Sequence, residues 1–284
     1  MALTDIGQIK DILTRHGFSF SKALGQNFLV NPSVCPKMAE SACEDENFGV
    51  LEVGPGIGVL TEQLSMRAKK VVSLELDKRL IPILKETLSE RDNITVINED
   101  VLKADLKGII KEHFDGMKVA VCANLPYYIT TPVIMRFLEE NLPIDSLVVM
   151  VQKEFALRIS SPPGTRDCGA ISASVFNVCD PQYLFEVKRG SFMPMPNVDS
   201  AVIKLKLKDK PVIEEGSDLF PSLVKGAFSQ RRKKAANALS SSLGKDKSIF
   251  EEAFTECGLS ASVRAEAITM DDWKKISEYL SQKL

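Results

Sequence analysis

The residues of this chain best suited to carry out chemistry are Asn124, Leu125, Pro126 and Tyr127. They follow the apolar run 119–123, and a run of that kind is typical of a buried strand in a parallel sheet. Open α/β sheets bind their ligands at the carboxyl ends of such strands. The position of the four residues therefore predicts that they lie in a ligand site.

The same four residues suit the activation of an exocyclic aromatic amine as a nucleophile. The lone pair of such an amine is delocalised into its ring, so a site must draw it out of conjugation. The side-chain oxygen of Asn124 and the backbone carbonyl of Leu125 or Pro126 could accept the two N–H hydrogens. Pro126 fixes its own φ and has no N–H, and Tyr127 offers a flat ring for a base. A plain turn is the alternative, because Asn and Pro are common turn residues.

A glycine-rich segment upstream, 54–58, follows a strand and opens a helix. Glycine lets the backbone turn tightly and approach a ligand closely. The spacing is G-x-G-x-G, which differs from the G-x-G-x-x-G of dinucleotide enzymes. Glu52 precedes the first glycine by two residues and could anchor a cationic group, directly or through water. This pattern suits S-adenosylmethionine as the cofactor.

Two further acids end the next two strands. Glu75 lies 21 residues after Gly54, where a carboxylate accepts ribose hydroxyls. Asp100 is placed to accept from an adenine N6 amino group. Each acid alone could be a helix N-cap or a surface charge. Three acids at the ends of three successive strands, together with the glycines, predict a nucleoside-cofactor site.

The segments that position these residues alternate between strand and helix. Strands are predicted at 50–53, 70–76, 93–98, 119–124 and 146–151. Helices are predicted at 59–67, 78–89, 106–113 and 131–140. This order predicts an α/β, Rossmann-like domain with a mostly parallel sheet. Segments 182–188 and 200–207 have no helix between them, so they are predicted as an antiparallel pair at one edge.

The character of the sequence changes after Lys208, where a charged and proline-containing linker begins. A chain of 284 residues has room for a full α/β domain and a smaller one. We predict a catalytic domain over residues 1–208 and a small all-helical domain over residues 209–284.

Composition excludes several classes of protein. Apolar residues make up 44% and charged residues 26%, as in soluble globular proteins. No apolar run approaches the roughly 18 residues of a membrane span, and the first residues resemble no signal peptide, so we expect a cytoplasmic protein. The six cysteines form no C-x-x-C pair and there are only two histidines, so neither a metal site nor histidine-based catalysis is expected.

Basic residues are concentrated in one part of a chain whose net charge is only −2. Between Lys204 and Lys245 there are ten Lys or Arg residues and four Asp or Glu residues, with the densest cluster at 230–234. Such a patch is the expected footprint of a nucleic-acid backbone. The alternative is a solvated basic helix face.

Taken together, these motifs closely resemble the family of small-subunit ribosomal RNA adenine dimethyltransferases over nearly the whole chain. Segment 22–29 resembles the family's leading cofactor motif. The resemblance implies that Gly54 contacts the cofactor backbone, Glu75 the ribose and Asp100 the adenine. The cofactor-binding residues that it implies are Asn27, Leu29, Gly54, Gly56, Glu75, Leu76, Asp100, Val101 and Asn124.

The target base is clamped, by the same resemblance, between Tyr127 and Phe192. Segment 192–200 matches the family's F-x-P-x-P-x-V-x-S loop, although Phe192 considered alone could equally plug an edge of the core. The resemblance makes the catalytic residues Asn124, Leu125, Pro126, Tyr127 and Phe192.

The C-terminal part carries a match to the bacterial F-x-Q-R-R-K signature. It implies RNA contacts from Arg231, Arg232, Lys233 and Lys234. The family usually continues with K-T-L-R-N, whereas this chain continues with Lys234-Ala235-Ala236-Asn237. The missing arginine leaves one detail of RNA docking open.

The activity that the resemblance implies is dimethylation of N6 in two adjacent adenosines of a hairpin loop near the 3′ end of small-subunit (16S) ribosomal RNA. S-adenosylmethionine is then the methyl donor, and no metal is needed. The expected partners are this RNA and the small subunit or its precursor, with a role in subunit biogenesis. We expect a monomer, because a large RNA must reach the carboxyl edge of the sheet.

Three alternatives remain. A large-subunit ribosomal RNA methyltransferase that confers antibiotic resistance would share the N-terminal motifs, but segment 230–233 favours the small-subunit enzyme. A non-catalytic assembly factor would show degraded motifs, and both the cofactor motif and Asn-Leu-Pro-Tyr are intact. DNA amine methyltransferases usually carry N/D-P-P-Y and a separate target-reading domain.

Overall fold

The structure is a computed structural model that describes residues 3–21, 25–214, 218–230 and 232–283. It divides into two compact units. The first comprises Met1–Ala156 and Gln182–Lys206, and the second comprises Leu157–Pro181 and Leu207–Leu284. The two units differ from the predicted domains in segment 157–181 and in residues 207–208, which cluster with the C-terminal residues.

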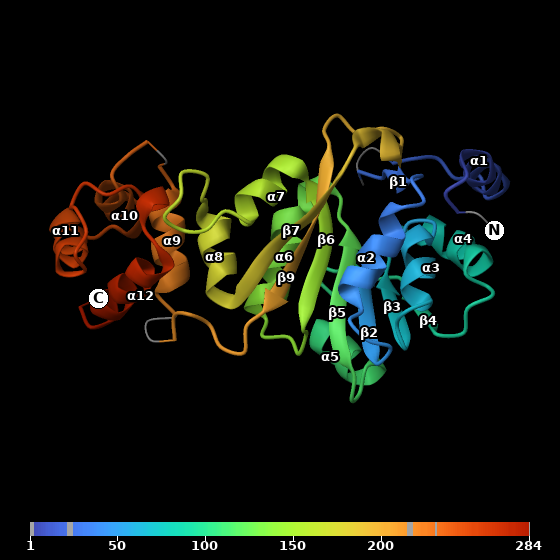
Figure 1. Ribbon diagram of the computed structural model, residues 1–284, viewed down its shortest axis with the longest axis horizontal. Helices are drawn as coiled ribbons and strands as arrows, with labels where there is room; N and C mark the ends of the chain where they lie inside the picture. Colours follow the sequence, from blue (N-terminus) through green and yellow to red (C-terminus); the bar gives the residue numbers. More distant parts are fainter. Residues whose placement is uncertain (1–2, 22–24, 215–217, 231, 284) are drawn as a thin grey trace. The chain divides into compact units, whose positions relative to one another are not determined.

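A seven-stranded sheet forms the centre of the first unit (Figure 1). Its order is β4 (Ile94–Ile97), β3 (Lys70–Leu74), β2 (Phe48–Val53), β5 (Lys118–Asn124), β6 (Ser146–Gln152), β9 (Ser200–Leu207) and β7 (Cys179–Val187). The strands from β4 to β6 are parallel, and β9 runs antiparallel to β6. The prediction of a mostly parallel sheet is confirmed, and the two late strands lie together at one edge.

Helices cover the sheet because its strands are apolar on both faces. On one face, alternate strand residues such as Val50, Cys122 and Val148 pack with the first four helices. These are α1 (Ile6–Arg15), α2 (Val34–Ala42), α3 (Val59–Ser65) and α4 (Ile81–Thr87). The crossovers before β5 and β6 contain α5 (Leu106–His113) and α6 (Thr130–Glu139), and α7 (Lys153–Ile159) follows β6.

A two-stranded ribbon joins two distant parts of the chain. In it β1 (Phe28–Leu29) pairs antiparallel with β8 (Phe192–Met193), so that Leu29 lies opposite Phe192. The sequence did not predict this pairing. It places the N-terminal cofactor motif directly beside the proline-rich loop.

The second unit is helical and has its own core. Its helices are α8 (Ala170–Val178), α9 (Phe220–Phe228), α10 (Ala235–Leu243), α11 (Lys247–Glu256) and α12 (Met270–Ser281). Trp273 is fully buried, and its ring meets that of Phe220 edge-on at 6.2 Å. Ala173 of α8 belongs to the same cluster, which explains why segment 157–181 joins this unit. Within the described residues, no helix is long and apolar enough to cross a membrane.

Candidate active site

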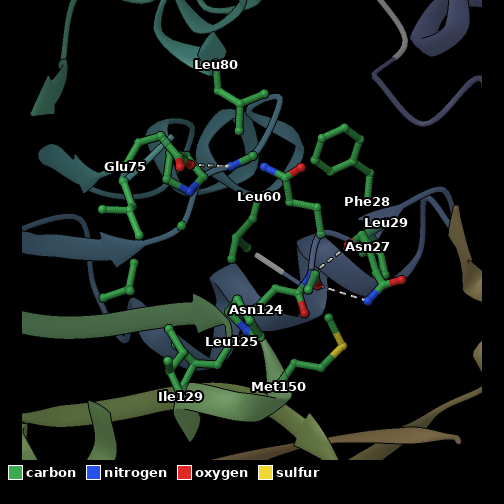
Figure 2. A pocket seen from close by; sticks show the side chains of 18 of the residues that line it. Asn27, Phe28, Leu29, Leu60, Glu75, Leu80, Asn124, Leu125, Ile129 and Met150 are labelled. Carbon is green, nitrogen blue, oxygen red and sulfur yellow. Dashed lines mark hydrogen bonds between the residues drawn. The ribbon is translucent and has the colours of Figure 1, made fainter. Parts of the chain in front are cut away.

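A cavity that is open to solvent lies at the carboxyl ends of the parallel strands in the first unit (Figure 2). Parallel strands all end at the same edge of a sheet, so the turns that follow them meet there. The cavity is lined by all the cofactor and catalytic residues that the family resemblance implies: Asn27, Leu29, Gly54, Gly56, Glu75, Leu76, Asp100, Val101, Asn124, Leu125, Pro126, Tyr127 and Phe192.

The glycine-rich turn between β2 and α3 forms one wall. Gly54 donates its N–H to the carbonyl of Leu74 at 3.0 Å, which ties the turn to β3. Its φ is +70°, where a side chain would be strained. A Cβ added at Gly54 would meet no heavy atom within 4 Å. The backbone of Gly54 therefore presents an open face that a ligand can approach closely.

Glu75 lies one residue beyond the end of β3, and backbone groups hold its carboxylate. Oε1 accepts from the N–H of Asp77 at 2.7 Å, and Oε2 accepts from the N–H of Gly56 at 3.4 Å (Figure 2). Burial raises the pKa of Glu75 to about 7, although these backbone bonds oppose the shift. Each carboxylate oxygen has a second lone pair, so Glu75 can still accept hydroxyl hydrogens from a ligand.

Glu52 does not line the cavity, which corrects the prediction that it directly anchors a cationic group there. Its Oε2 accepts from the hydroxyls of Thr61 at 2.7 Å and Ser73 at 2.6 Å, and Oε1 has no partner among the described residues. Burial raises the pKa of Glu52 to about 7 despite the two hydroxyl bonds. The reason for the error is the strand pleat, which turns Glu52 under α3 instead of toward the edge.

The turn after β4 brings Asp100 to the cavity. Asp100 Oδ1 accepts from the N–H of Leu102 at 2.9 Å. The Asp100 carbonyl accepts from Lys103 at 2.8 Å and from Ala104 at 2.9 Å. No donor among the described residues bonds to Asp100 Oδ2, so this oxygen is available to a ligand.

Asn124 is the last residue of β5 and lies opposite Met150 of β6. Its Nδ2 donates toward the carbonyl of Asn27 at 3.5 Å (Figure 2). Because the amide nitrogen is used in this way, Oδ1 is left as an acceptor, and no described donor bonds to it. The structure thus presents the acceptor oxygen that amine activation requires.

The backbone of the next two residues decides which carbonyl could be the second acceptor. The Pro126 carbonyl already accepts from the N–H of Ile129 at 3.1 Å and from the hydroxyl of Thr130 at 3.3 Å. Leu125 donates its N–H to Met150 at 3.2 Å, and its carbonyl accepts no hydrogen bond within the described part of the chain. The geometry therefore favours the Leu125 carbonyl.

Two aromatic residues meet the cavity from different elements. Tyr127 begins a 3₁₀ turn (Tyr127–Ile129), and its hydroxyl is hydrogen-bonded to that of Ser200 on β9 at 2.8 Å. Burial raises the pKa of Tyr127, so its hydroxyl stays neutral. Phe192 is 5% exposed and belongs to the core cluster of the first unit while also lining the cavity. Both of the roles that the sequence left open for Phe192 thus fit its position.

The N-terminal motif is held to the turn after Glu75. Gln26 donates from Nε2 to Asp77 Oδ2 at 2.9 Å and accepts the N–H of Ser21 at 2.9 Å. Arg79 binds the same Asp77 carboxylate and, with Gln26, keeps its pKa well below the usual range. Lys22, Ala23 and Leu24 of this motif lie outside the described residues.

The sequence reasoning missed several residues that line the cavity. Tyr128 is 56% exposed, and its place directly after Asn-Leu-Pro-Tyr was an available signal. Gln26 and Phe28 stood inside the quoted N-terminal motif, whereas nothing in the sequence distinguished Met150 from other apolar strand residues. In the part of the chain that is described, no group of three or more His, Cys, Asp or Glu residues could hold a metal ion.

Three of the four predicted RNA-binding residues lie in the second unit, on the connection between α9 and α10. Arg232, Lys233 and Lys234 are exposed there, and the N–H of Lys233 donates to the carbonyl of Gln230 at 2.9 Å. Arg231 lies outside the described residues. The described part of this basic segment is therefore accessible to a polyanion.

Comparison with known proteins assigns the chain to a family. Residues 17–282 match the family described as ribosomal RNA adenine dimethylase. The chain belongs to this family. It is 46% identical over 277 residues to ribosomal RNA small subunit methyltransferase A of Alkaliphilus oremlandii, covering 97% of this chain and 96% of that protein. It is 45% identical over 276 residues to the protein of the same name from Bacillus thuringiensis, covering 95% and 94%.

Solved structures support the same fold for this adenine dimethylase. The 23S ribosomal RNA methyltransferase ErmE matches with a TM-score of 0.69 and 28% identity, over 90% of this chain and 100% of that one. A dimethyladenosine transferase from Plasmodium falciparum matches with a TM-score of 0.73 and 24% identity, over 90% and 98%. The predicted Rossmann-like methyltransferase fold is confirmed.

Proposed function

We propose that this dimethylase transfers methyl groups from S-adenosylmethionine to the N6 amine of two adjacent adenosines in small-subunit ribosomal RNA. The observation that carries the proposal is the pair of unused acceptors at the end of β5. Asn124 Oδ1 and the Leu125 carbonyl both belong to the wall of a cavity that also contains Glu75. The small-subunit relatives of similar length support the choice of RNA.

The cavity has the features that the cofactor needs. The open face of Gly54 leaves room for the amino-acid part of the cofactor, because a Cβ there would occupy free space. Glu75 would accept the ribose hydroxyls, and Asp100 Oδ2 would accept from the adenine amino group. Lining residues complete the cofactor site: Asn27, Leu29, Gly56, Leu76 and Val101. When bound, S-adenosylmethionine supplies an electrophilic methyl group.

Asn124 and Leu125 would hold the target amine. Two acceptors that take its two hydrogens favour a tetrahedral nitrogen, and its lone pair is then directed away from the ring. Positioning of this kind can account for roughly 7–11 kcal/mol of a barrier in well-oriented reactions. The nitrogen becomes acidic only after it has accepted the methyl group, so its proton can leave to water. No strong base is needed beside Asn124.

Tyr127 and Phe192 would clamp the target base. The hydrogen bond between the hydroxyls of Tyr127 and Ser200 fixes the far end of the ring, so the ring face is held in one orientation. Base–aromatic stacking contributes about 1–3 kcal/mol per base. Because the target must leave its own stack before it can reach the amine acceptors, this contribution offsets part of the cost of unstacking.

The basic segment would bind the RNA backbone. Arg232, Lys233 and Lys234 are exposed in the second unit, and Arg231 precedes them in the sequence. Single-stranded loops are the usual targets of sequence-specific RNA recognition, in agreement with a hairpin-loop substrate. We propose residues 209–284 as the principal part of an RNA-recognition domain. The protein would act as a monomer on the small subunit or its precursor in the cytoplasm.

The test is mass spectrometry of ribosomal RNA from cells that lack this protein. We expect N6,N6-dimethyladenosine to disappear from small-subunit RNA and to return with a wild-type gene but not with an Asn124→Ala copy. Large-subunit RNA from the same cells is the control. Unchanged small-subunit RNA together with loss of a methylated adenosine from large-subunit RNA would contradict the proposal and favour the activity named for ErmE.

A further inference from the structure

Arg136 on α6 binds two backbone carbonyls of the turn that follows β4. Its Nη2 donates to the carbonyl of Ala104 at 2.6 Å, and its Nη1 donates to the carbonyl of Val101. Its Nε donates at 2.6 Å to Oε1 of Glu140, the C-cap residue of α6. Only 17% of the Arg136 side chain is exposed. These contacts use all three nitrogens of the guanidinium.

The turn held by Arg136 is the one that carries Asp100 into the cavity. From inside the turn, Asp100 accepts the backbone N–H groups of Leu102 and Ala104. From outside, Arg136 takes the carbonyls of Val101 and Ala104. A planar guanidinium fixes the separation and the direction of two acceptors at once, which a flexible ammonium does not. The position of Asp100 is therefore set from both sides of the turn.

The other end of α6 is attached to the turn that holds the target amine. The helix begins at Thr130, and the Thr130 hydroxyl donates to the carbonyl of Pro126 at 3.3 Å. One short helix thus connects the Asn-Leu-Pro-Tyr turn to the Asp100 turn through Arg136. A short α-helix is stiff. The length of α6 therefore sets the distance between the Asn-Leu-Pro-Tyr turn and the turn that carries Asp100.

We propose that Arg136 is a positioning residue that sets Asp100 to receive the adenine of the cofactor, at a fixed distance from the amine-holding turn. This inference rests on the proposed function, because it takes the ligand of Asp100 to be S-adenosylmethionine. Arg136 does not line the cavity, so a cofactor and a target base held there would not touch it. Its substitution should therefore weaken cofactor binding and leave the chemical step intact once the cofactor is saturating.

Calorimetric titration of the full-length protein with S-adenosylmethionine tests the inference. We expect Arg136→Met to weaken cofactor affinity about tenfold, the loss typical of a charge-assisted hydrogen bond. Arg136→Lys keeps the charge but lacks the planar guanidinium that binds both carbonyls, so its loss of cofactor affinity should be smaller than that of Arg136→Met. The matched control is Glu140→Gln, which leaves both carbonyl contacts in place and should change affinity by no more than about twofold.

A second readout separates positioning from general destabilisation. In methyl-transfer assays, Arg136→Met should raise the KM for the cofactor about tenfold while kcat changes by less than about twofold. The loss in Arg136→Met combined with Asp100→Ala should be smaller than the product of the two single losses, since both act on the same contact. If Arg136→Met does not fold, the same comparison with Arg136→Lys decides the question.

Three results would overturn the inference, and a fourth would affect the proposed function instead. Wild-type affinity in Arg136→Met, or losses that multiply fully in the double variant, would show that Arg136 does not act through Asp100. A fall in kcat with an unchanged KM would also contradict a role in cofactor binding. If the wild-type protein itself failed to bind S-adenosylmethionine, the proposed function would fail.

Discussion

Two buried carboxyls, one within β2 and one just beyond the neighbouring strand β3, have a similarly raised pKa but different surroundings. Glu52 is enclosed by the hydroxyls of Thr61 and Ser73, whereas Glu75 is held by backbone N–H groups and faces the cavity. Burial raises the pKa of both to about 7. A raised pKa alone therefore does not identify a ligand-binding acid. What distinguishes the two is whether a ligand can reach the oxygens.

The contrast follows from where each acid stands relative to its strand. Glu52 lies within β2, and the pleat directs it to the face covered by α3. Glu75 lies beyond the last residue of β3, where the chain has left the sheet. The following N–H groups can then turn toward its carboxylate. Within the strand, Glu52 forms polar contacts in the protein interior. Beyond the strand, Glu75 is placed to bind a ligand.

The largest effect should come from the cavity wall, at Asn124. Asn124→Ala should lower the single-turnover rate of methyl transfer at least about 100-fold, because the amine loses the acceptor that orients it. Cofactor affinity should stay within about tenfold of wild type. The control is Asn47→Ala, in the turn just before β2 and outside the cavity wall. A rate near the wild-type value would show that Asn124 does not hold the amine.

The second largest effect should be on cofactor affinity, which should distinguish Glu75 from Glu52. We expect Glu75→Ala to weaken binding of S-adenosylmethionine about 10- to 100-fold, since two hydroxyl hydrogen bonds to a charged acceptor are lost. Glu52→Gln should stay within about twofold. Calorimetry on both variants measures the difference. Equal losses would mean that Glu52 contributes to the cofactor site after all.

The pH dependence of binding should also be specific to Glu75. With its pKa at about 7, the free protein holds this carboxyl protonated at pH 6, and the proton must leave before both oxygens can accept. Affinity should be about tenfold weaker at pH 6 than at pH 8. Glu75→Gln should remove this component, and the ligand's own titration remains in both proteins. A Glu75→Gln profile that matches wild type would contradict the assignment.

The smallest effect on binding, and the clearest on stability, belongs to Glu52. A folded-state pKa of about 7 against an ordinary value of 4.5 means that the folded protein retains a proton that the unfolded chain has lost. The contribution of Glu52 to the free energy of unfolding is therefore largest below pH 4.5. It falls by up to about 3 kcal/mol as the pH rises to 7.

Denaturant unfolding at several pH values measures that contribution. Glu52→Gln should flatten the pH dependence between pH 4.5 and 7, leaving the part due to Glu75. The loss of stability on acidification below pH 4 should be the same in the variant, because it arises from groups such as Asp77 whose pKa is lowered in the folded protein. If the free energy of unfolding of the variant and of wild type changes in the same way from pH 4.5 to 7, Glu52 is not the buried group that stays protonated in the folded protein.

Much of the fold and of the candidate site follows from local sequence. The parallel strands were readable from their apolar runs. Glu75, Asp100 and Asn124 could be placed in one cavity because each lies at or just beyond the carboxyl end of a strand of one sheet. Such residues meet whatever the details of the packing are. The glycine spacing likewise indicated a close approach of the backbone to a ligand.

Other features depend on contacts between distant residues and were not readable. The pairing of Leu29 with Phe192 arises from tertiary packing of two very short strands. The direction of Glu52 depended on where β2 ends, and boundaries are the least certain part of a sequence prediction. The role of Arg136 required knowing that α6 packs beside the Asp100 turn.

The most direct test of the central claim is an in vitro transfer reaction. Purified protein is mixed with isotopically labelled S-adenosylmethionine and small subunits that lack the modification, and the RNA is digested to nucleosides for mass spectrometry. We predict that the label enters N6,N6-dimethyladenosine with wild-type protein and that Asn124→Ala incorporates none. Label in a different nucleoside, or incorporation that Asn124→Ala leaves unchanged, would contradict the claim that this cavity methylates adenine N6.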